Sequence, residues 1–233
     1  MFFMSKKLNL LFTICIFCLF SCAPKDSQNS RGNLAENKKT FESININELM
    51  ISLLKADKKL TPKLVHNIDG SSFYTYIKKP GEVDINLKEI KKRISLGSDF
   101  YISDREKVSN LLKRINKLKI NNKIANLSEG VLGYWIPSKD LIIIDYRAIE
   151  MGSPIFLDVL RHEVIHVAQS CFSSKRTNFP KRIGLPLEFS KEINLNLHNY
   201  SQNLNEMLNI EREAFTYSKI DGAASKLLNK FCK

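Results

Sequence analysis

Apolar residues recur every three or four positions along the first half of the chain, and this spacing predicts amphipathic helices. Residues 46–59 have apolar side chains at positions 46, 49, 50, 53 and 54, and residues 103–120 have them at 108, 111, 112, 115 and 118. Ser103 and Asp104 are expected to cap the second helix. A shorter helix is expected over residues 87–97. This half of the chain is therefore predicted to be mainly helical.

β-branched and aromatic residues dominate two neighbouring segments further along the chain. They are "VLGYWIP" at 131–137 and "LIIIDYRAI" at 141–149, separated by the polar tripeptide Ser-Lys-Asp. Such composition favours strands, and the short polar spacer favours a tight turn between them. One more short strand is expected around residues 73–77, in a stretch that is otherwise broken by proline and glycine.

The segment that begins at Ser153 has few polar positions on any side. Ser153 suits the N-cap of a helix and Pro154 its first position, so a helix is predicted from Pro154 to about Ser170. A helix with so little polar surface is expected to lie in the centre of the protein. Further helices are expected up to the C-terminus, with a break near Gly222. The pattern as a whole predicts an α+β fold, mainly helical, with a small antiparallel strand pair ahead of the central helix.

The first 22 residues follow a different plan. Lys6 and Lys7 precede an apolar run over residues 8–20, and small Ser21 precedes Cys22. This order is the layout of a bacterial export signal, and the run is too short to span a bilayer comfortably. The end of the segment, "LFSC", resembles the lipobox of bacterial lipoproteins, in which the cysteine is lipidated and becomes the new N-terminus. The resemblance implies a lipidated Cys22.

The export signal sets the expected domain organisation. Residues 1–21 are the predicted signal peptide, and residues 22–41 are too polar to bury a core and form a predicted flexible tether. Residues 42–233 are long enough for a single domain. We therefore expect a lipid-anchored protein on the extracytoplasmic side of a bacterial membrane, facing the periplasm or the cell surface.

The chain is basic, with 36 Lys and Arg against 24 Asp and Glu and a formal net charge of +12. The lysines are scattered through predicted helices and are not interleaved with aromatic residues, so no stacking platform for nucleic acid is visible. Predicted export also argues against a nucleic-acid partner. We expect a solvated basic surface that is weakly attracted to anionic lipid or cell wall.

Three cysteines remain once the signal is removed: Cys22, Cys171 and Cys232. If Cys22 carries lipid, two thiols are left in an oxidising compartment, and a Cys171–Cys232 disulfide is expected. The alternative is a pair of buried free thiols. Neither cysteine belongs to a CxxC pair, so the sequence does not support a cysteine zinc cluster.

The motif that carries chemistry is "HEVIH", residues 162–166. His162 and His166 are four positions apart, which places both imidazoles on one helix face, where two nitrogens can take two corners of a tetrahedral zinc. Glu163 lies one residue further round the helix, beside the expected metal and turned away from it, as a general base for water requires. If the motif were coincidental, three polar side chains would be buried in the central helix without a common purpose. Burying polar groups without partners costs several kcal/mol.

A catalytic zinc takes three protein ligands and leaves one position open. The histidine that would complete the extended metzincin motif is absent, since Phe172 stands there, so the third ligand must come from elsewhere. Residues 209–218, "NIEREAFTYS", offer Glu211 and, as an alternative, Glu213. A carboxylate on the solvated face of this helix is the remaining possibility.

Residues 130–220 resemble the gluzincins, the HExxH metallopeptidases of the thermolysin-like clan. Their third zinc ligand is a glutamate on a later helix, often with a small residue three positions on, and Glu211 with Ala214 fits that spacing. Phe215 stands where better-known members carry an acidic or amide residue that orients a ligating histidine. The resemblance implies a zincin-like domain, one catalytic Zn²⁺ and hydrolysis of peptide bonds with Glu163 as general base.

The resemblance also implies how substrate would be held. In the family the strand ahead of the active helix binds extended peptide by edge pairing, so residues 131–136 or 141–144 would form the edge. A second group besides zinc must stabilise the oxyanion. The candidates, among which the sequence does not choose, are His198, Tyr200, Arg212 and Tyr217. Asp158 and Gln169 could orient a ligand ring or serve only structure.

Two other functions compete with a membrane-tethered zinc peptidase that acts on peptide or protein substrates. The first is an exported binding or scaffold lipoprotein that holds zinc without turnover, because the position at Phe215 and the oxyanion donor are unfilled. The second is a protein without metal whose motif is coincidental.

Overall fold

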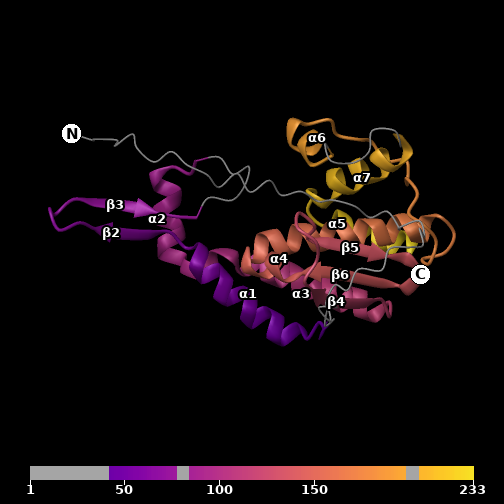
Figure 1. The fold of residues 1–233 in the computed structure, drawn as a ribbon, viewed down its shortest axis with the longest axis horizontal. Coiled ribbons are helices and arrows are strands. Elements are labelled where there is room, and N and C mark those ends of the chain that lie inside the picture. The colour runs from indigo at the N-terminus through magenta and orange to yellow at the C-terminus, as the bar shows by residue number, and fades with distance from the viewer. Residues whose placement is uncertain (1–41, 78–83, 198–204) are drawn as a thin grey trace, which may run out of the picture.

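The computed structural model describes residues 42–77, 84–197 and 205–233 of the 233-residue chain. The predicted signal, the tether and Cys22 lie outside these ranges. None of the helices within them is long and apolar enough to cross a bilayer. The fold is α+β and mostly helical, with two small sheets, as Figure 1 shows.

The larger sheet has four strands in the order β1-β4-β6-β5, with bounds Glu42–Ser43, Asn121–Ala125, Leu141–Asp145 and Gly133–Ile136. The expected antiparallel pair is confirmed as β5 and β6, joined by a 3-10 turn at Pro137–Lys139. The expectation of a strand pair alone was wrong, because β4 joins β6 in parallel and β1 pairs with β4. β4 was missed because its sequence, "NNKIA", is half polar and has no apolar alternation.

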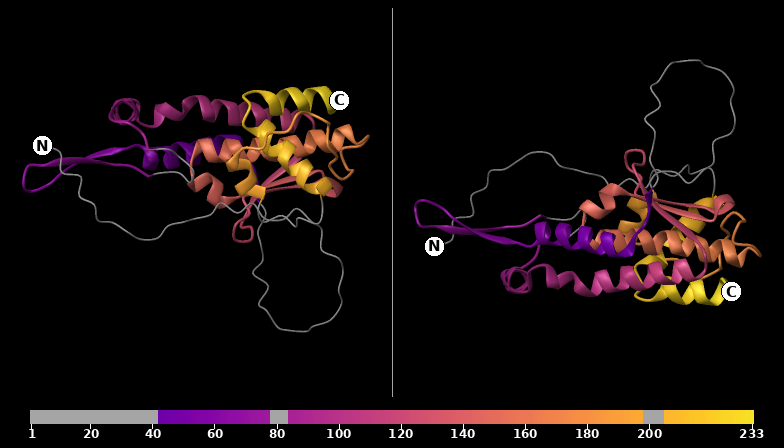
Figure 2. Two further views of the ribbon diagram at one scale, coloured as in Figure 1. Left: turned by 90° about the horizontal axis from the view of Figure 1, so that it is seen from above. Right: turned by 90° about the horizontal axis from the view of Figure 1, so that it is seen from below.

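Helices cover the sheet and extend beyond it (Figures 1 and 2). Their bounds are Ile46–Leu60 (α1), Leu87–Leu96 (α2), Ile102–Lys117 (α3), Tyr146–Glu150 (α4), Ser153–Phe172 (α5), Lys191–Leu197 (α6), Asn205–Ser218 (α7) and Ala223–Phe231 (α8). A 3-10 turn at Gly97–Tyr101 leads directly into α3. Ser103 and Asp104 therefore lie inside α3, and the cap expected from them is wrong.

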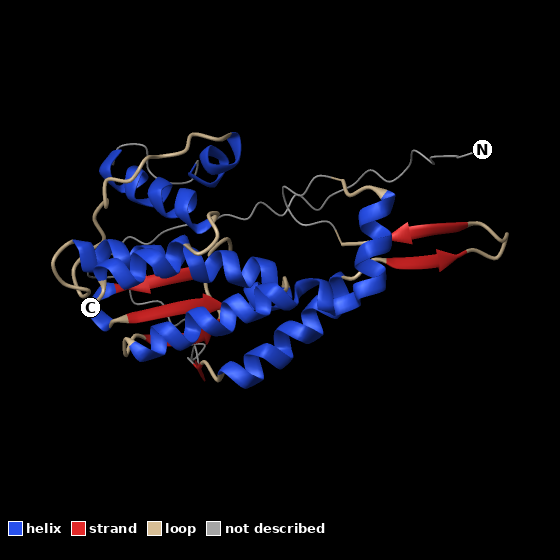
Figure 3. Cartoon of the chain, turned by 180° about the vertical axis from the view of Figure 1, so that it is seen from behind, coloured by secondary structure: helices blue, strands red, loops and turns tan. Residues whose placement is uncertain are grey.

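A separate two-stranded hairpin, β2 (Lys63–His66) and β3 (Ser72–Thr75), projects from one end of the molecule, as Figure 3 shows from behind. The strand expected near residues 73–77 is β3. Its partner β2 was not predicted, because "KLVH" is too short to reveal a period of two.

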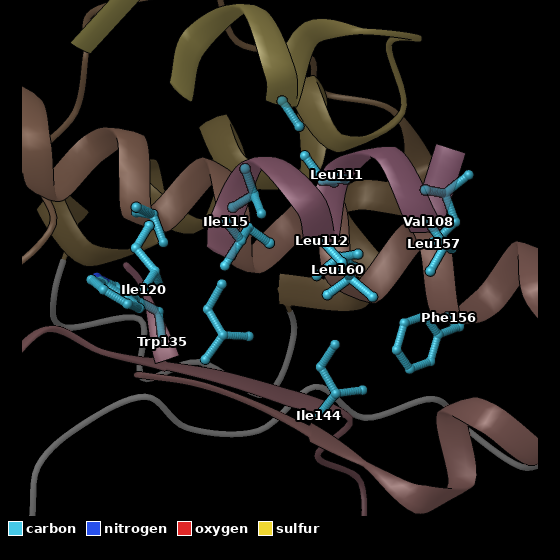
Figure 4. Close-up of a cluster of buried hydrophobic side chains, with 14 of the residues drawn as sticks. Val108, Leu111, Leu112, Ile115, Ile120, Trp135, Ile144, Phe156, Leu157 and Leu160 are labelled. Carbon is cyan, nitrogen blue, oxygen red and sulfur yellow. The ribbon is translucent and has the colours of Figure 1, made fainter. Parts of the chain in front are cut away.

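The main core lies between α3, α5 and the inner face of the larger sheet (Figure 4). Val108, Leu112 and Ile115 of α3 are fully buried, as are Phe156 and Leu160 of α5. Trp135 and Ile144 contribute from the sheet. The prediction that α5 is central is confirmed, since thirteen of its residues are buried. A helix fixed on several sides is a rigid support for a site.

The start of α5 is capped by a residue far away in the sequence. The N-cap position is Gly152, not Ser153, and it provides no side-chain hydrogen bond. Asp57 of α1 takes this role instead: its carboxylate accepts hydrogen bonds from the Ser153 backbone N–H at 2.8 Å and from the Ser153 hydroxyl at 2.6 Å. Arg105 of α3 donates to the same buried carboxylate. Asp57 thus ties α1 and α3 to the start of the central helix.

The far end of α5 is tied down by a covalent bond. Cys171 in its last turn and Cys232, directly after α8, form a disulfide in the structure. α8 packs along α5, so the bond joins two helices that already lie side by side.

Candidate metal centre

Three polar side chains converge between α5 and α7. The Nε2 atoms of His162 and His166 lie 3.0 Å apart, and each lies 3.3 Å from Oε2 of Glu211. All three residues are buried, and they form a group within the described residues that could hold a metal ion.

The dimensions of this triangle fit a tetrahedral zinc. Ligands held about 2.0–2.1 Å from such an ion lie about 3.3–3.4 Å from one another. Two imidazole nitrogens and a carboxylate oxygen are also donors that zinc prefers. Because the nitrogen lone pairs face each other in a buried space, a cation at their centre would replace repulsion by attraction. The three residues therefore fit the ion that the sequence motif leads us to expect.

Glu211 and Glu213 have different surroundings, although both are buried on α7. Glu211 faces the histidines of α5. The Glu213 carboxylate accepts hydrogen bonds from the backbone N–H groups of Ile183, Gly184 and Leu185 at 2.9–3.0 Å. Glu213 therefore holds the connector between α5 and α6. It was the alternative third ligand from the sequence, and the structure places its carboxylate at this connector and outside the metal-ligand group.

His166 is oriented by a hydrogen-bonded chain that crosses from α5 to α7. Its Nδ1 lies 2.8 Å from Oε1 of Gln169, which can only accept, so Nδ1 carries a proton whether the ring is neutral or charged. Nε2, which faces Glu211, is therefore the nitrogen that would coordinate a metal once it has no proton. The Gln169 amide nitrogen donates in turn to the Ile210 carbonyl at 3.0 Å and to Glu213 at 2.9 Å. Gln169 is thus fixed in the orientation that serves His166.

His162 lacks an equivalent support. Its Nδ1 is buried and has no hydrogen-bond partner among the residues that the structure describes. The ring of Phe215 packs against the imidazole instead, with centroids 4.3 Å apart and planes tilted by 49°. The phenyl ring has no hydrogen-bonding group, so it supports the imidazole by packing alone.

Glu163 is pressed against the edge strand β5. A Cβ added to Gly133 would lie 2.7 Å from Oε1 of Glu163 and 2.8 Å from Cγ1 of Val159, so only glycine allows the strand to come this close. The Trp135 backbone N–H donates a hydrogen bond to the Glu163 carboxylate. The contacts of Gly133 and Trp135 with Glu163 were not predicted, because nothing in "GYWI" says which of its residues meet the helix.

Burial and mutual charge shift the pKa values of the group. Burial raises the pKa of Glu163 to about 8, and repulsion from Glu211 adds to the rise. Burial would lower the pKa of His166, but attraction to Glu211 outweighs it and raises that pKa to about 9. Burial lowers the pKa of His162. For Glu211 burial is outweighed by the two imidazoles, which hold its pKa well below the usual range. The Glu211 carboxylate is therefore ready to bind a cation.

β5 forms the outer edge of the sheet beside the site. The Asp145 backbone N–H donates to the Leu132 carbonyl, so in the alternating antiparallel pattern the backbone groups of Gly133 and Trp135 point away from β6. The edge nearest α5 is thus residues 133–136. Residues 141–144 lie between β4 and β5, so their expected role as an edge is wrong.

A small cleft opens beside the candidate ligands. His166 and Glu211 form part of its wall, and the rest of the lining is mostly apolar: Trp135, Phe179, Pro180, Met207 and Ile210. The connector residues Phe179 and Pro180 belong to the segment that Glu213 and Ser173 hold in place.

The remaining candidates from the sequence lie away from the triangle or are otherwise engaged. Asp158 pairs with Lys219 at 3.6 Å. Arg212 donates to Asn194 at 2.7 Å, and its guanidinium lies over the ring of Phe189. Tyr217 packs against the main core. His198 and Tyr200 lie outside the described residues.

Comparison of the chain with known protein families, curated proteins and solved structures gives no match.

Proposed function

We propose that this protein is a zinc-dependent metallopeptidase of the gluzincin type. His162, His166 and Glu211 are the proposed zinc ligands, and Glu163 is the proposed general base. The observation that carries the proposal is the triangle of Nε2, Nε2 and Oε2 atoms with sides of 3.0, 3.3 and 3.3 Å. Its two histidine corners lie on the same buried helix as Glu163, and its carboxylate corner lies on α7.

The chain's own residues supply most of the mechanism. A bound Zn²⁺ would act as a Lewis acid and bring the pKa of water close to neutrality. Glu163 accepts the proton from the attacking water and passes it to the leaving amine. The Trp135 N–H, and the close packing against Gly133, hold the Glu163 carboxylate in one place. Gln169 keeps the proton of His166 on Nδ1.

Peptide substrate is proposed to bind as an extended strand against the outer edge of β5. The backbone groups of Gly133 and the Trp135 carbonyl point to that edge. The Trp135 N–H donates to Glu163, so a peptide there would pass beside the general base. Trp135 also lines the small cleft next to His166 and Glu211, so this cleft adjoins the proposed path of the peptide.

The cellular setting belongs to the same proposal. The N-terminal layout supports an exported lipoprotein anchored through Cys22, with residues 22–41 as tether. Such a protein would act outside the cytoplasm of a bacterium, on the periplasmic or cell-surface side. A Cys171–Cys232 disulfide is consistent with an oxidising compartment.

Two observations favour a second candidate, a zinc-holding lipoprotein that binds or scaffolds without turnover. Within the part of the chain that the structure describes, His162 has no hydrogen-bond partner at Nδ1. Arg212, a candidate to stabilise the oxyanion, is held by Asn194. Both features leave the metal ligands intact while weakening the case for catalysis.

Hydrolysis of a broad peptide library by the purified zinc-loaded protein separates the two candidates. We expect the unmutated protein to cleave peptides, and Glu163→Gln to lose about 10²–10⁴ in rate while its zinc content stays at one equivalent. No cleavage by the unmutated, fully zinc-loaded protein would favour the scaffold. Loss of zinc from Glu163→Gln would contradict the role given to this residue.

A further inference from the structure

The β2–β3 hairpin is an arm without a core of its own. Among the elements that the structure describes, β2 and β3 pack extensively only against each other. The hairpin projects from the end of the molecule opposite α6 and α7, and α2 lies across its base (Figures 1 and 3). A lone two-stranded hairpin is at best marginally stable in water. An arm of this kind is stabilised when a further surface covers it.

The arm exposes large apolar side chains. Leu64 and Phe73 on the strands are more than two-fifths exposed, and Ile68 at the tip is completely exposed. The tip is held by Asp69, whose carboxylate accepts hydrogen bonds from the backbone N–H and the hydroxyl of Ser71. Most of the exposed large apolar residues of the described chain lie between Ile51 and Ile102, around the arm and its base. Their concentration at one end distinguishes it from an ordinary surface.

Exposed lysines lie at the base of the arm. They are found where α1 leads into the hairpin and along α2, at Lys58, Lys59, Lys63, Lys88, Lys91 and Lys92. α2 itself exposes Leu87 and Ile94, one apolar stripe beside its lysines. Exposed apolar side chains next to a group of lysines are typical of a segment that lies in the interface of an anionic bilayer.

The same composition argues against a protein as the covering surface. Protein interfaces are depleted in lysine, because an ammonium group is costly to desolvate, and they favour arginine and aromatic residues. At a bilayer the long lysine side chains can lie along the apolar surface and keep their charge among the lipid headgroups. The lysines at the base of the arm and on α2 therefore fit lipid better than protein.

We propose that the hairpin arm, residues 63–75 with α2 at its base, docks on the surface of an anionic bilayer, with Ile68 entering the headgroup and acyl boundary. This contact is independent of the zinc chemistry. It would turn the end of the molecule that carries α6 and α7, next to the candidate metal centre, away from the membrane (Figure 1).

Quenching of an added tryptophan by brominated acyl chains tests the proposal. The chain has one tryptophan, Trp135, which is buried and gives a constant background. The full chain carrying Ile68→Trp is reconstituted into vesicles of phosphatidylcholine, with or without phosphatidylglycerol, whose acyl chains are brominated. Only protein that floats with the vesicles is measured, so the readout is quenching and not binding. We expect at least a twofold loss of the added fluorescence in anionic vesicles and much less in neutral ones.

Leu195→Trp is the matched control, because Leu195 is also apolar and exposed but lies on α6 at the opposite end. It should be unquenched in both vesicles. Combined Lys88→Glu, Lys91→Glu and Lys92→Glu substitutions in the Ile68→Trp chain should remove the quenching in anionic vesicles. Absence of quenching in the Ile68→Trp chain, or equal quenching of the two tryptophan probes, would overturn the proposal. Equal quenching of the Ile68→Trp chain in anionic and neutral vesicles would overturn the role assigned to the lysines.

Discussion

Gln169 lies one turn after His166 on α5 and accepts a hydrogen bond from its Nδ1 at 2.8 Å. The same side chain donates to Glu213 and to the Ile210 carbonyl on the helix that carries Glu211. One buried amide therefore links the motif helix, the helix of the third candidate ligand and the connector that Glu213 holds. The geometry of the candidate centre depends on this amide as well as on the three ligands.

Gln169→Ala is the first prediction. Without the acceptor at Nδ1 the His166 ring can rotate and change tautomer, and Glu213 loses a donor, so zinc affinity should fall about 10–100-fold. Competition with a chelating dye measures it. Ser173→Ala, further along α5 and away from the histidines, is the control and should bind zinc normally. Unchanged affinity of Gln169→Ala would show that the hydrogen bond does not orient the ligand.

Gly133→Ala concerns the general base. The added methyl group would meet Glu163 and Val159 below 3 Å, so the carboxylate must move. We expect kcat to fall about 10–100-fold, as small displacements of catalytic groups do. Zinc content should stay at one equivalent, because Gly133 touches none of the three ligands. Steady-state kinetics with a cleaved library peptide give kcat, and metal analysis gives the zinc content. Unchanged kcat together with a loss of zinc would contradict the contact proposed between Gly133 and the general base.

Asp57→Ala tests the tertiary cap of α5. The substitution removes the acceptor of the Ser153 N–H and leaves Arg105 without its buried partner. Loss of one member of a buried ion pair costs about 3–5 kcal/mol, so urea unfolding should show a decrease of that size. Asp99→Ala is the matched control: Asp99 also faces Arg105, at 3.9 Å, but its side chain is 74% exposed. Its removal should cost less than about 1 kcal/mol. Equal losses would contradict the capping role.

Asp145 gives the protein an acid-sensitive element. Burial would raise the pKa of Asp145, but hydrogen bonds from Arg147 and from the Leu127 N–H outweigh it and lower that pKa. A group whose pKa is lower in the folded state stabilises the protein above its unfolded pKa, about 3.9, and loses that contribution as the pH falls. Unfolding free energy measured between pH 6 and 3 should therefore fall more steeply for the unmutated protein than for Asp145→Asn. Parallel curves would contradict this.

How far the sequence predicted the fold depended on the length and regularity of each element. The helices α1, α3 and α5 and the strands β5 and β6 have long apolar patterns, and each was expected. β4 and β2 are short and mixed in polarity, so they become strands only because a neighbour pairs with them. The cap of α5 could not be foreseen either, because Asp57 is 96 residues from Ser153 and only the tertiary fold brings them together.

Some residues of the candidate site could be predicted from the sequence, and others could not. A single helical repeat relates His162, Glu163 and His166, so the motif was readable from spacing alone. The choice between Glu211 and Glu213 needed the rotation of α7 about its axis and the path of the connector, which residue spacing leaves open. Gly133 and Trp135 act through backbone proximity to Glu163, and the sequence carries no mark of such a contact.

A crystal structure of the zinc-loaded protein with anomalous data at the zinc edge would show whether His162, His166 and Glu211 bind one zinc ion. We expect a single anomalous peak within about 2.0–2.2 Å of both Nε2 atoms and one Glu211 carboxylate oxygen, with no peak in the Glu211→Ala protein. Glu213→Gln, matched in helix and burial, should keep the peak. A fully loaded protein whose zinc lies elsewhere, or whose ligand set omits Glu211, would contradict the claim.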